Sequence, residues 1–184
     1  MINLKIKGLP DSIEYKGDSF QIKTDYRAWL DFPQKMKDIN SGNFDGYISL
    51  FADDVAPLCD DTLKQLLDFY SPERIVPKDT GEDDGPELMD YTIDGDYIYA
   101  GFMQAYSIDL IDVDMHWHKF LALLAGLPED TVMSQIIKYR AYDGNSKDVG
   151  YKEYKKLQQV WELPVKYTEE EQRQIDEFES LFGG

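Results

Sequence analysis

Two histidines, His116 and His118, each follow an aspartate four residues earlier, Asp112 and Asp114. The apolar residues that come next recur at helical spacing, so we expect a helix here. Each imidazole could then hydrogen-bond a carboxylate one turn back, and each pair could offer metal ligands. On a helix of 3.6 residues per turn, however, the two histidines point about 200° apart. The pattern therefore predicts two local polar pairs near the start of a helix rather than one metal site.

Other catalytic patterns are absent from the sequence. It has no glycine-rich phosphate loop, no nucleophile elbow and no paired-histidine zinc helix. A calcium loop that starts at Asp90 or at Thr80 would need a carboxylate at its twelfth position, but Gly101 and Tyr91 stand there. The single cysteine, Cys59, is expected to be a small buried apolar residue. We predict a protein that is not an enzyme and that has no metal or cofactor.

The charge balance narrows the classes of partner. The 184 residues include 36 acidic and 19 basic ones, for a formal net charge of -17. Binding to nucleic acid or to anionic membranes needs clustered Lys and Arg, so both are disfavoured. An acidic chain can instead bind basic protein surfaces. One cysteine, no long apolar run and no signal-peptide pattern lead us to expect a soluble protein of the cytosol.

The N-terminal residues predict a small sheet. Residues 2–7 alternate apolar and polar side chains as a half-buried strand does, and the turn Lys16-Gly17-Asp18 joins two further short strands into a hairpin. Thr24-Asp25 is expected to start a helix that Pro33 kinks or ends. A sheet of two or three strands is unstable alone, so it should pack on the helices that follow.

The rest of the chain predicts helices. We expect a short helix in 44–51 and a second that begins at Asp60-Asp61 and stops at Ser71-Pro72. A helix that begins at Asp109 or Asp112 should carry Val113 on its apolar stripe and end at Gly126. Four more helices are expected to begin at Asp94, Asp130, Ser146 and Thr168. The charged, turn-rich residues 73–90 are read as a linker or loop between an N-terminal region (1–72) and a helical region (91–184) that pack as one unit. The predicted class is mainly α with a small N-terminal β-hairpin (α+β).

Aromatic residues crowd the centre of the chain. Tyr97 and Tyr99 point about 200° apart on a helix, so only one of them can lie on the buried stripe. We expect the exposed members of the set Tyr97, Tyr99, Tyr106 and Trp117 to form a surface for a client protein or for self-association, because such side chains are favoured at interfaces. The alternative is that they are ordinary tyrosines at a helix edge.

Several ordered blocks resemble one phage family. They are Asp96-Tyr97-Ile98-Tyr99-Ala100, the segments around Phe102, Gln104-Ala105-Tyr106 and Ile108-Asp109-Leu110, His116-Trp117-His118-Lys119-Phe120, Gly126-Leu127-Pro128 and Tyr139-Arg140, with an early block 22–29 and a late one near Lys155-Lys156-Leu157. Together they are similar to the "gene product 15" family of long-tailed phages and prophages of Gram-positive bacteria, over about residues 10 to 165. The family often has an aromatic residue where this chain has His118, which favours packing over metal binding there.

The resemblance implies a tail assembly chaperone, encoded between the major tail protein and the tape measure protein. Such a chaperone would hold the tape measure protein soluble while the major tail (tube) protein polymerises around it, and would be absent from the mature virion. The resemblance supplies no catalytic residues.

Two other functions remain open. A structural tail or tail-completion component would stay in the virion, where mass spectrometry would detect it. An acidic inhibitor that mimics DNA would need carboxylates at duplex-like spacing, whereas the acids here concentrate at 79–96 and 169–179.

Overall fold

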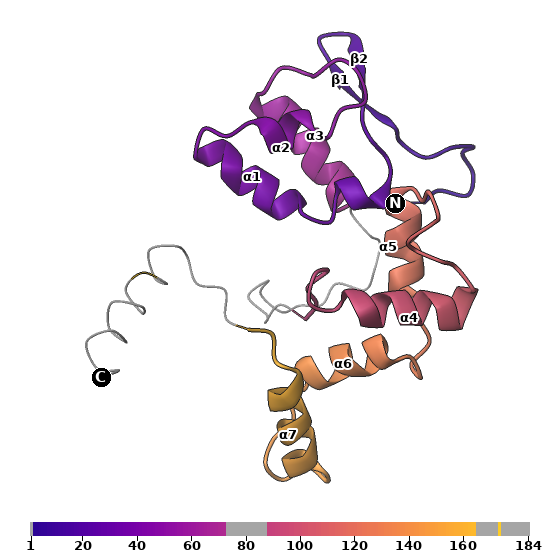
Figure 1. Cartoon of the computed structure of the whole chain (residues 1–184), viewed down its shortest axis with the longest axis vertical. Helices are drawn as coiled ribbons and strands as arrows, with labels where there is room; N and C mark the ends of the chain where they lie inside the picture. Colours follow the sequence, from indigo (N-terminus) through magenta and orange to yellow (C-terminus); the bar gives the residue numbers. More distant parts are fainter. Residues whose placement is uncertain (1, 73–87, 165–172, 174–184) are drawn as a thin grey trace.

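A computed structural model describes residues 2–72, 88–164 and 173 of the chain (Figure 1). In these ranges the elements in chain order are β1 (Ser12–Tyr15), β2 (Asp18–Gln21), the short 3₁₀ helix η1 (Tyr26–Ala28), α1 (Phe32–Asn40), α2 (Asp45–Ile48), α3 (Asp60–Tyr70), α4 (Gly95–Tyr106), α5 (Trp117–Ala125), α6 (Val132–Arg140) and α7 (Tyr151–Trp161). The hairpin lies with α1 to α3 at one end of the molecule, and α6 and α7 lie at the other (Figure 1). The predicted α+β class is confirmed.

The predicted hairpin forms around Lys16 and Gly17. Both residues have positive φ, at 52° and 94°, which is the backbone of the tight turn that matches strand twist. β1 and β2 are antiparallel, with Ile13 opposite Phe20. The side chain of Gln65 in α3 accepts from the N–H of Glu14 at 2.9 Å and donates to its carbonyl at 2.8 Å. The hairpin is therefore fastened to α3.

The strand predicted in residues 2–7 is wrong. This segment makes only turns and bends, and the side chains of Leu4 and Ile6 are 95% and 65% exposed. At the outer edge of β1, Gln65 already takes the backbone groups of Glu14, so a third strand cannot pair with that residue. Residues 2–7 therefore alternate like a strand but pair with no other strand among the described residues.

The role predicted for Pro33 is also wrong. Pro33 is the second residue of α1 and helps to start that helix instead of ending one. A proline is tolerated there because the first N–H groups of a helix have no partner within it. A helix does start at Thr24-Asp25 as predicted, but Asp25 rather than Thr24 is the cap, with its carboxylate accepting from the N–H of Arg27, and the helix is only the three residues of η1.

One aromatic core joins the two sides of residues 73–87. Trp29, Phe32, Phe102, Trp117 and Phe120 are all at most 1% exposed. Rings from the N-terminal side stack on rings from the C-terminal side, with centroids 4.6 Å apart for Tyr26–Phe120 and 5.4 Å apart for Tyr70–Trp117. Stacked aromatic pairs add to the large apolar area that each ring buries. The hairpin region and the helical region thus share a single interior.

Three helix starts differ from prediction. α5 begins after His116, so neither Asp109 nor Asp112 caps it and Val113 lies in the irregular segment 107–116. Thr131 rather than Asp130 caps α6, and α7 begins at Tyr151 rather than near Ser146. α3 begins at Asp60 as predicted, but Cys59 rather than Asp60-Asp61 caps it. The predicted start of α4 and the predicted end of α5 at Gly126 are confirmed. The helix expected at Thr168 lies outside the described residues.

No helix in the described ranges is both long enough and apolar enough to cross a membrane.

Candidate protein-binding site

The four aromatic residues predicted to form a surface lie in different surroundings. Trp117 is 1% exposed and its indole N–H donates to the carbonyl of Tyr70 at 2.8 Å, so it belongs to the core and offers no surface. Tyr97 packs edge-on against Trp161 of α7, with ring centroids 5.4 Å apart. The hydroxyl of Tyr106 donates to a backbone carbonyl of α5. Only Tyr99 lies at a hollow.

That hollow, called the apolar hollow below, has a volume of about 630 Å³ and is open to solvent. Its floor is apolar and mostly buried, made of Tyr26, Leu30, Ile98, Leu110 and Phe120. These residues come from η1 and the turn after it, from α4, from the segment 107–116 and from α5. The hollow therefore forms only when elements from both halves of the chain pack together.

The rim of the apolar hollow is polar on two sides. Arg27, Asp96 and Tyr99 line it, together with Ile111, whose side chain is 74% exposed. Such a large aliphatic side chain costs free energy when it stays in water. The hollow thus joins an apolar floor to an exposed aliphatic side chain at its edge.

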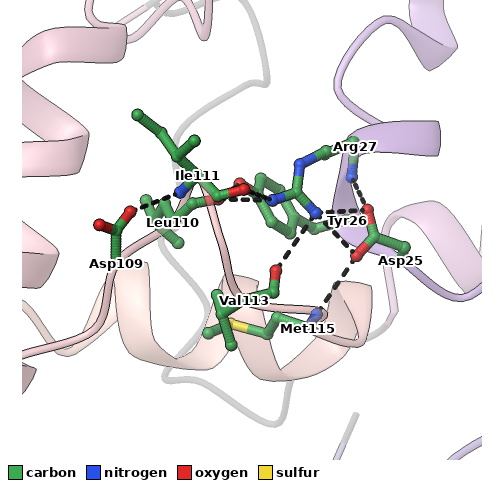
Figure 2. Close-up of polar contacts among 8 residues, drawn as sticks. All are labelled: Asp25, Tyr26, Arg27, Asp109, Leu110, Ile111, Val113 and Met115. Atoms are coloured by element: carbon green, nitrogen blue, oxygen red, sulfur yellow. Dashed lines mark hydrogen bonds and ion pairs between the residues drawn. The ribbon is translucent and has the colours of Figure 1, made fainter.

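Arg27 shapes the rim by holding the segment 107–116 (Figure 2). Its guanidinium donates to the carbonyls of Leu110 at 2.6 Å, Ile111 at 2.8 Å and Val113 at 3.2 Å. The same guanidinium forms an ion pair with Asp25, at 3.1 Å. Because all these acceptors are used at once, the positive charge of Arg27 is largely satisfied within the molecule.

Other contacts hold the same segment from the N-terminal side. The hydroxyl of Tyr26 donates to the carbonyl of Leu110 at 2.6 Å, and burial raises the pKa of that phenol. The carboxylate of Asp25 accepts from the backbone N–H of Met115 at 3.2 Å (Figure 2). Three consecutive residues, 25–27, thus clasp a segment more than eighty residues away in the sequence. We call this set of contacts the 25–27 clasp.

Carboxylates gather beside Tyr99. Its hydroxyl donates to Asp109 at 3.3 Å, and the other carboxylate oxygen of Asp109 accepts from the N–H of Ile111 at 2.8 Å. Partial burial, then the negative charges of Asp109 and of Asp112, raise the pKa of Tyr99. With Asp96 on the rim, this side of the apolar hollow is acidic.

The wall that carries Asp96 is anchored by a buried ion pair, called the 94–140 pair below. Asp94 and Arg140 are 1% and 6% exposed, and two bonds of 2.6 and 2.9 Å join them. Arg140 also donates to the carbonyls of Trp161 and Leu88. This one guanidinium therefore connects the start of α4, the end of α6 and the end of α7.

His116 does not pair with Asp112 as predicted. It is the residue before α5, and its Nδ1 accepts from the backbone N–H of His118 at 3.0 Å. Its Nε2 lies 2.8 Å from the carbonyl of Pro10 and must therefore donate to it. His116 caps a helix, and burial lowers its pKa.

His118 does not pair with Asp114 either. It is 4% exposed, and its Nε2 lies 2.8 Å from the carbonyl of Phe69, so that nitrogen carries the proton. Nδ1 is buried with no hydrogen-bond partner within the described residues. A second proton would place a charge on that unpartnered nitrogen. Burial accordingly lowers the pKa of His118 to about 4.

In the described ranges of the chain, no three His, Cys, Asp or Glu side chains are grouped so that they could hold a metal ion. Cys59 is half-buried rather than fully buried, because it precedes α3 as its capping residue, with its N–H donating to the hydroxyl of Thr62.

Sequence reasoning identified Tyr99 but missed the rest of the apolar hollow. Leu30, Leu110 and Ile111 are ordinary aliphatic residues in the sequence, and no local spacing connects them. The one signal in the sequence that could have pointed to this site was the triplet Asp25-Tyr26-Arg27, which places a helix-capping carboxylate, an aromatic ring and a guanidinium at adjacent positions.

Comparison with known proteins gives one match. The family model described as "Bacteriophage Gp15 protein" matches residues 6–163, which is most of the chain. No curated protein matches, and no solved structure matches.

Proposed function

The chain belongs to the bacteriophage Gp15 family, and from this premise we propose that it is a tail assembly chaperone of long-tailed phages and prophages of Gram-positive bacteria. It binds the tape measure protein in the host cytoplasm and keeps it soluble while the major tail protein polymerises around it. It then leaves before the virion is complete. The protein performs no catalysis and needs no cofactor.

The observation that carries the proposal is the apolar hollow in an acidic surface. A long helical client aggregates when its apolar stripes meet, and a chaperone prevents this by covering them. The floor of the hollow offers apolar area that can cover an apolar stripe of the client, and Ile111 extends that area to the surface. The net charge of -17 keeps chaperone–client complexes apart from one another by repulsion.

Co-expression with the tape measure protein encoded by the same phage tests the proposal. We expect the client, insoluble when expressed alone, to become soluble and to elute together with this chain on size exclusion. An insoluble client that shows no association would overturn the proposal.

Purified virions provide a second test. A chaperone should be absent or strongly depleted when the particles are analysed by mass spectrometry. A fixed copy number relative to the major tail protein would instead favour a structural tail component.

A further inference from the structure

We propose that the apolar hollow is the client-binding site and that its occupant is an aliphatic side chain on a helical segment flanked by Lys or Arg. This inference rests on the proposed function and adds to it the position of the site and the chemistry that it recognises.

The aliphatic character of the occupant follows from the floor. Tyr26, Ile98, Leu110 and Phe120 are at most 6% exposed, and the ring stack of Tyr26 on Phe120 closes the bottom of the hollow. No charged side chain belongs to this floor among the described residues. A polar occupant would therefore lose its hydration without gaining hydrogen bonds there. An aliphatic side chain has no hydrogen bonds to water to give up, and when it fills the hollow it removes the apolar floor from water.

The basic character of the occupant follows from the rim. Arg27 is the only cation among the described lining residues, and it is already paired with Asp25 and with three carbonyls. Asp96 is exposed, and Asp109 lies behind Tyr99 and Ile111. A segment with an acid beside its anchor would meet these carboxylates and be repelled, whereas a Lys or Arg would be attracted.

The helical form of the occupant follows from the shape. The hollow is open to solvent, and its lining comes from the first half of α4, from η1, from the segment 107–116 and from α5. A helix that lays one apolar face into an open groove is a recurrent way in which proteins bind such partners. One turn of a helix places its anchor in the hollow and its flanking residues over the rim.

Two variants separate the apolar from the electrostatic contribution. Gly95 lines the hollow, and a Cβ added there meets nothing within 4 Å. Because there is room for a Cβ, we expect G95L to fold and its larger side chain to occupy part of the hollow. D96K reverses the charge of the rim at the second residue of α4. The matched control is D61K, because Asp61 is an exposed aspartate at the second residue of α3.

The binding assay uses a fluorescently labelled amphipathic helical peptide with leucines on one face and lysines on the other. Two further peptides serve as probes, one with every leucine replaced by alanine and one with every lysine replaced by glutamate. Fluorescence anisotropy gives the Kd of each, and thermal unfolding confirms that all variants are folded. We expect the Leu/Lys peptide to bind the wild type and D61K alike, and G95L and D96K to weaken it at least about tenfold, as loss of an anchor at a binding site does.

Three results would overturn the inference. One is equal affinity for the alanine peptide, which would mean attraction by charge alone. Another is binding that G95L leaves unchanged. The third is an equal loss of affinity in D96K and D61K, which would mean that the acidic surface acts as a whole.

Co-expression of the same variants with the tape measure protein separates the two proposals. If the wild type solubilises the client and both G95L and D96K do so equally well, the chaperone function stands and the assigned site is wrong. If the wild type itself fails to bind the client, the proposed function is wrong, whatever the peptides do.

Discussion

The 94–140 pair allows the sharpest test of the packing. R140M keeps most of the volume of the side chain and removes its charge, which leaves the carboxylate of Asp94 1% exposed without its cation. Removing one partner of a buried ion pair typically costs about 3–5 kcal/mol. The variant also loses the bonds to Trp161 and Leu88. We therefore expect the free energy of unfolding to fall by an amount within or above that range.

D94N should also cost about 3–5 kcal/mol, because it leaves the guanidinium of Arg140 buried without its anion and sets an amide NH2 against the Arg140 N–H that bonds the second oxygen. The double variant D94N/R140M should lose less than the sum of the two single losses, since neither charge then remains buried alone. K138M is the matched control. Lys138 lies on the same helix and is exposed, so its loss should change stability by no more than about 0.5 kcal/mol.

Urea unfolding followed by tryptophan fluorescence measures these values. With an m-value of about 2 kcal/mol per M, a loss of about 3–5 kcal/mol lowers the midpoint by about 1.5–2.5 M. Trp161 receives a bond from Arg140, so its emission should also change in R140M. A loss below about 1 kcal/mol in R140M, or additive losses in the double variant, would refute the reasoning.

Three further predictions concern other positions. Because the pKa of His118 is about 4 in the folded chain and about 6.5 in the unfolded one, its contribution to stability is complete above pH 6.5 and is lost as pH falls from 6.5 to 4. H118Q should reduce the change in unfolding free energy between pH 6.5 and pH 4 by at most about 3 kcal/mol. The same dependence of unfolding free energy on pH in H118Q and in the wild type would contradict this. C59S should raise the thermal midpoint, with a gain of about 0.5–1 kcal/mol, because serine is the better capping residue for α3; a lower midpoint would count against the capping role. R27A should speed amide hydrogen exchange in residues 107–116, and unchanged protection there would show that the 25–27 clasp does not hold the segment.

The features of the fold that sequence predicted are those determined by neighbouring residues. The turn at Lys16-Gly17 needs only its own backbone preference, and the end of α5 at Gly126 needs only a local stop. The strand expected in residues 2–7 does not form, because alternation alone does not supply a strand to pair with, and Gln65 takes the backbone groups of Glu14 at the outer edge of β1. The prediction for Pro33 was wrong because a proline can end one helix or begin the next, and here it lies in the first turn of α1.

The candidate site depended on contacts that no local pattern contains. Asp109 and Asp112 looked like helix caps, but the 25–27 clasp pulls the segment 107–116 into an irregular path before α5 can begin. Trp117 looked like an interface residue by its type, yet its ring stacks on Tyr70 in the core. The residue type showed that these aromatic side chains matter, but which of them is buried depended on how the two halves of the chain pack together.

The 25–27 clasp has a consequence for which substitutions this chain can tolerate. Arg27 grips the carbonyl oxygens of Leu110, Ile111 and Val113, and carbonyls are the same whatever side chain a residue carries. Exposed positions in this segment, such as Ile111 and Asp112, can therefore mutate without loosening their anchor. The contact thus depends on the backbone alone, so the exposed side chains of this segment can change while the scaffold stays the same.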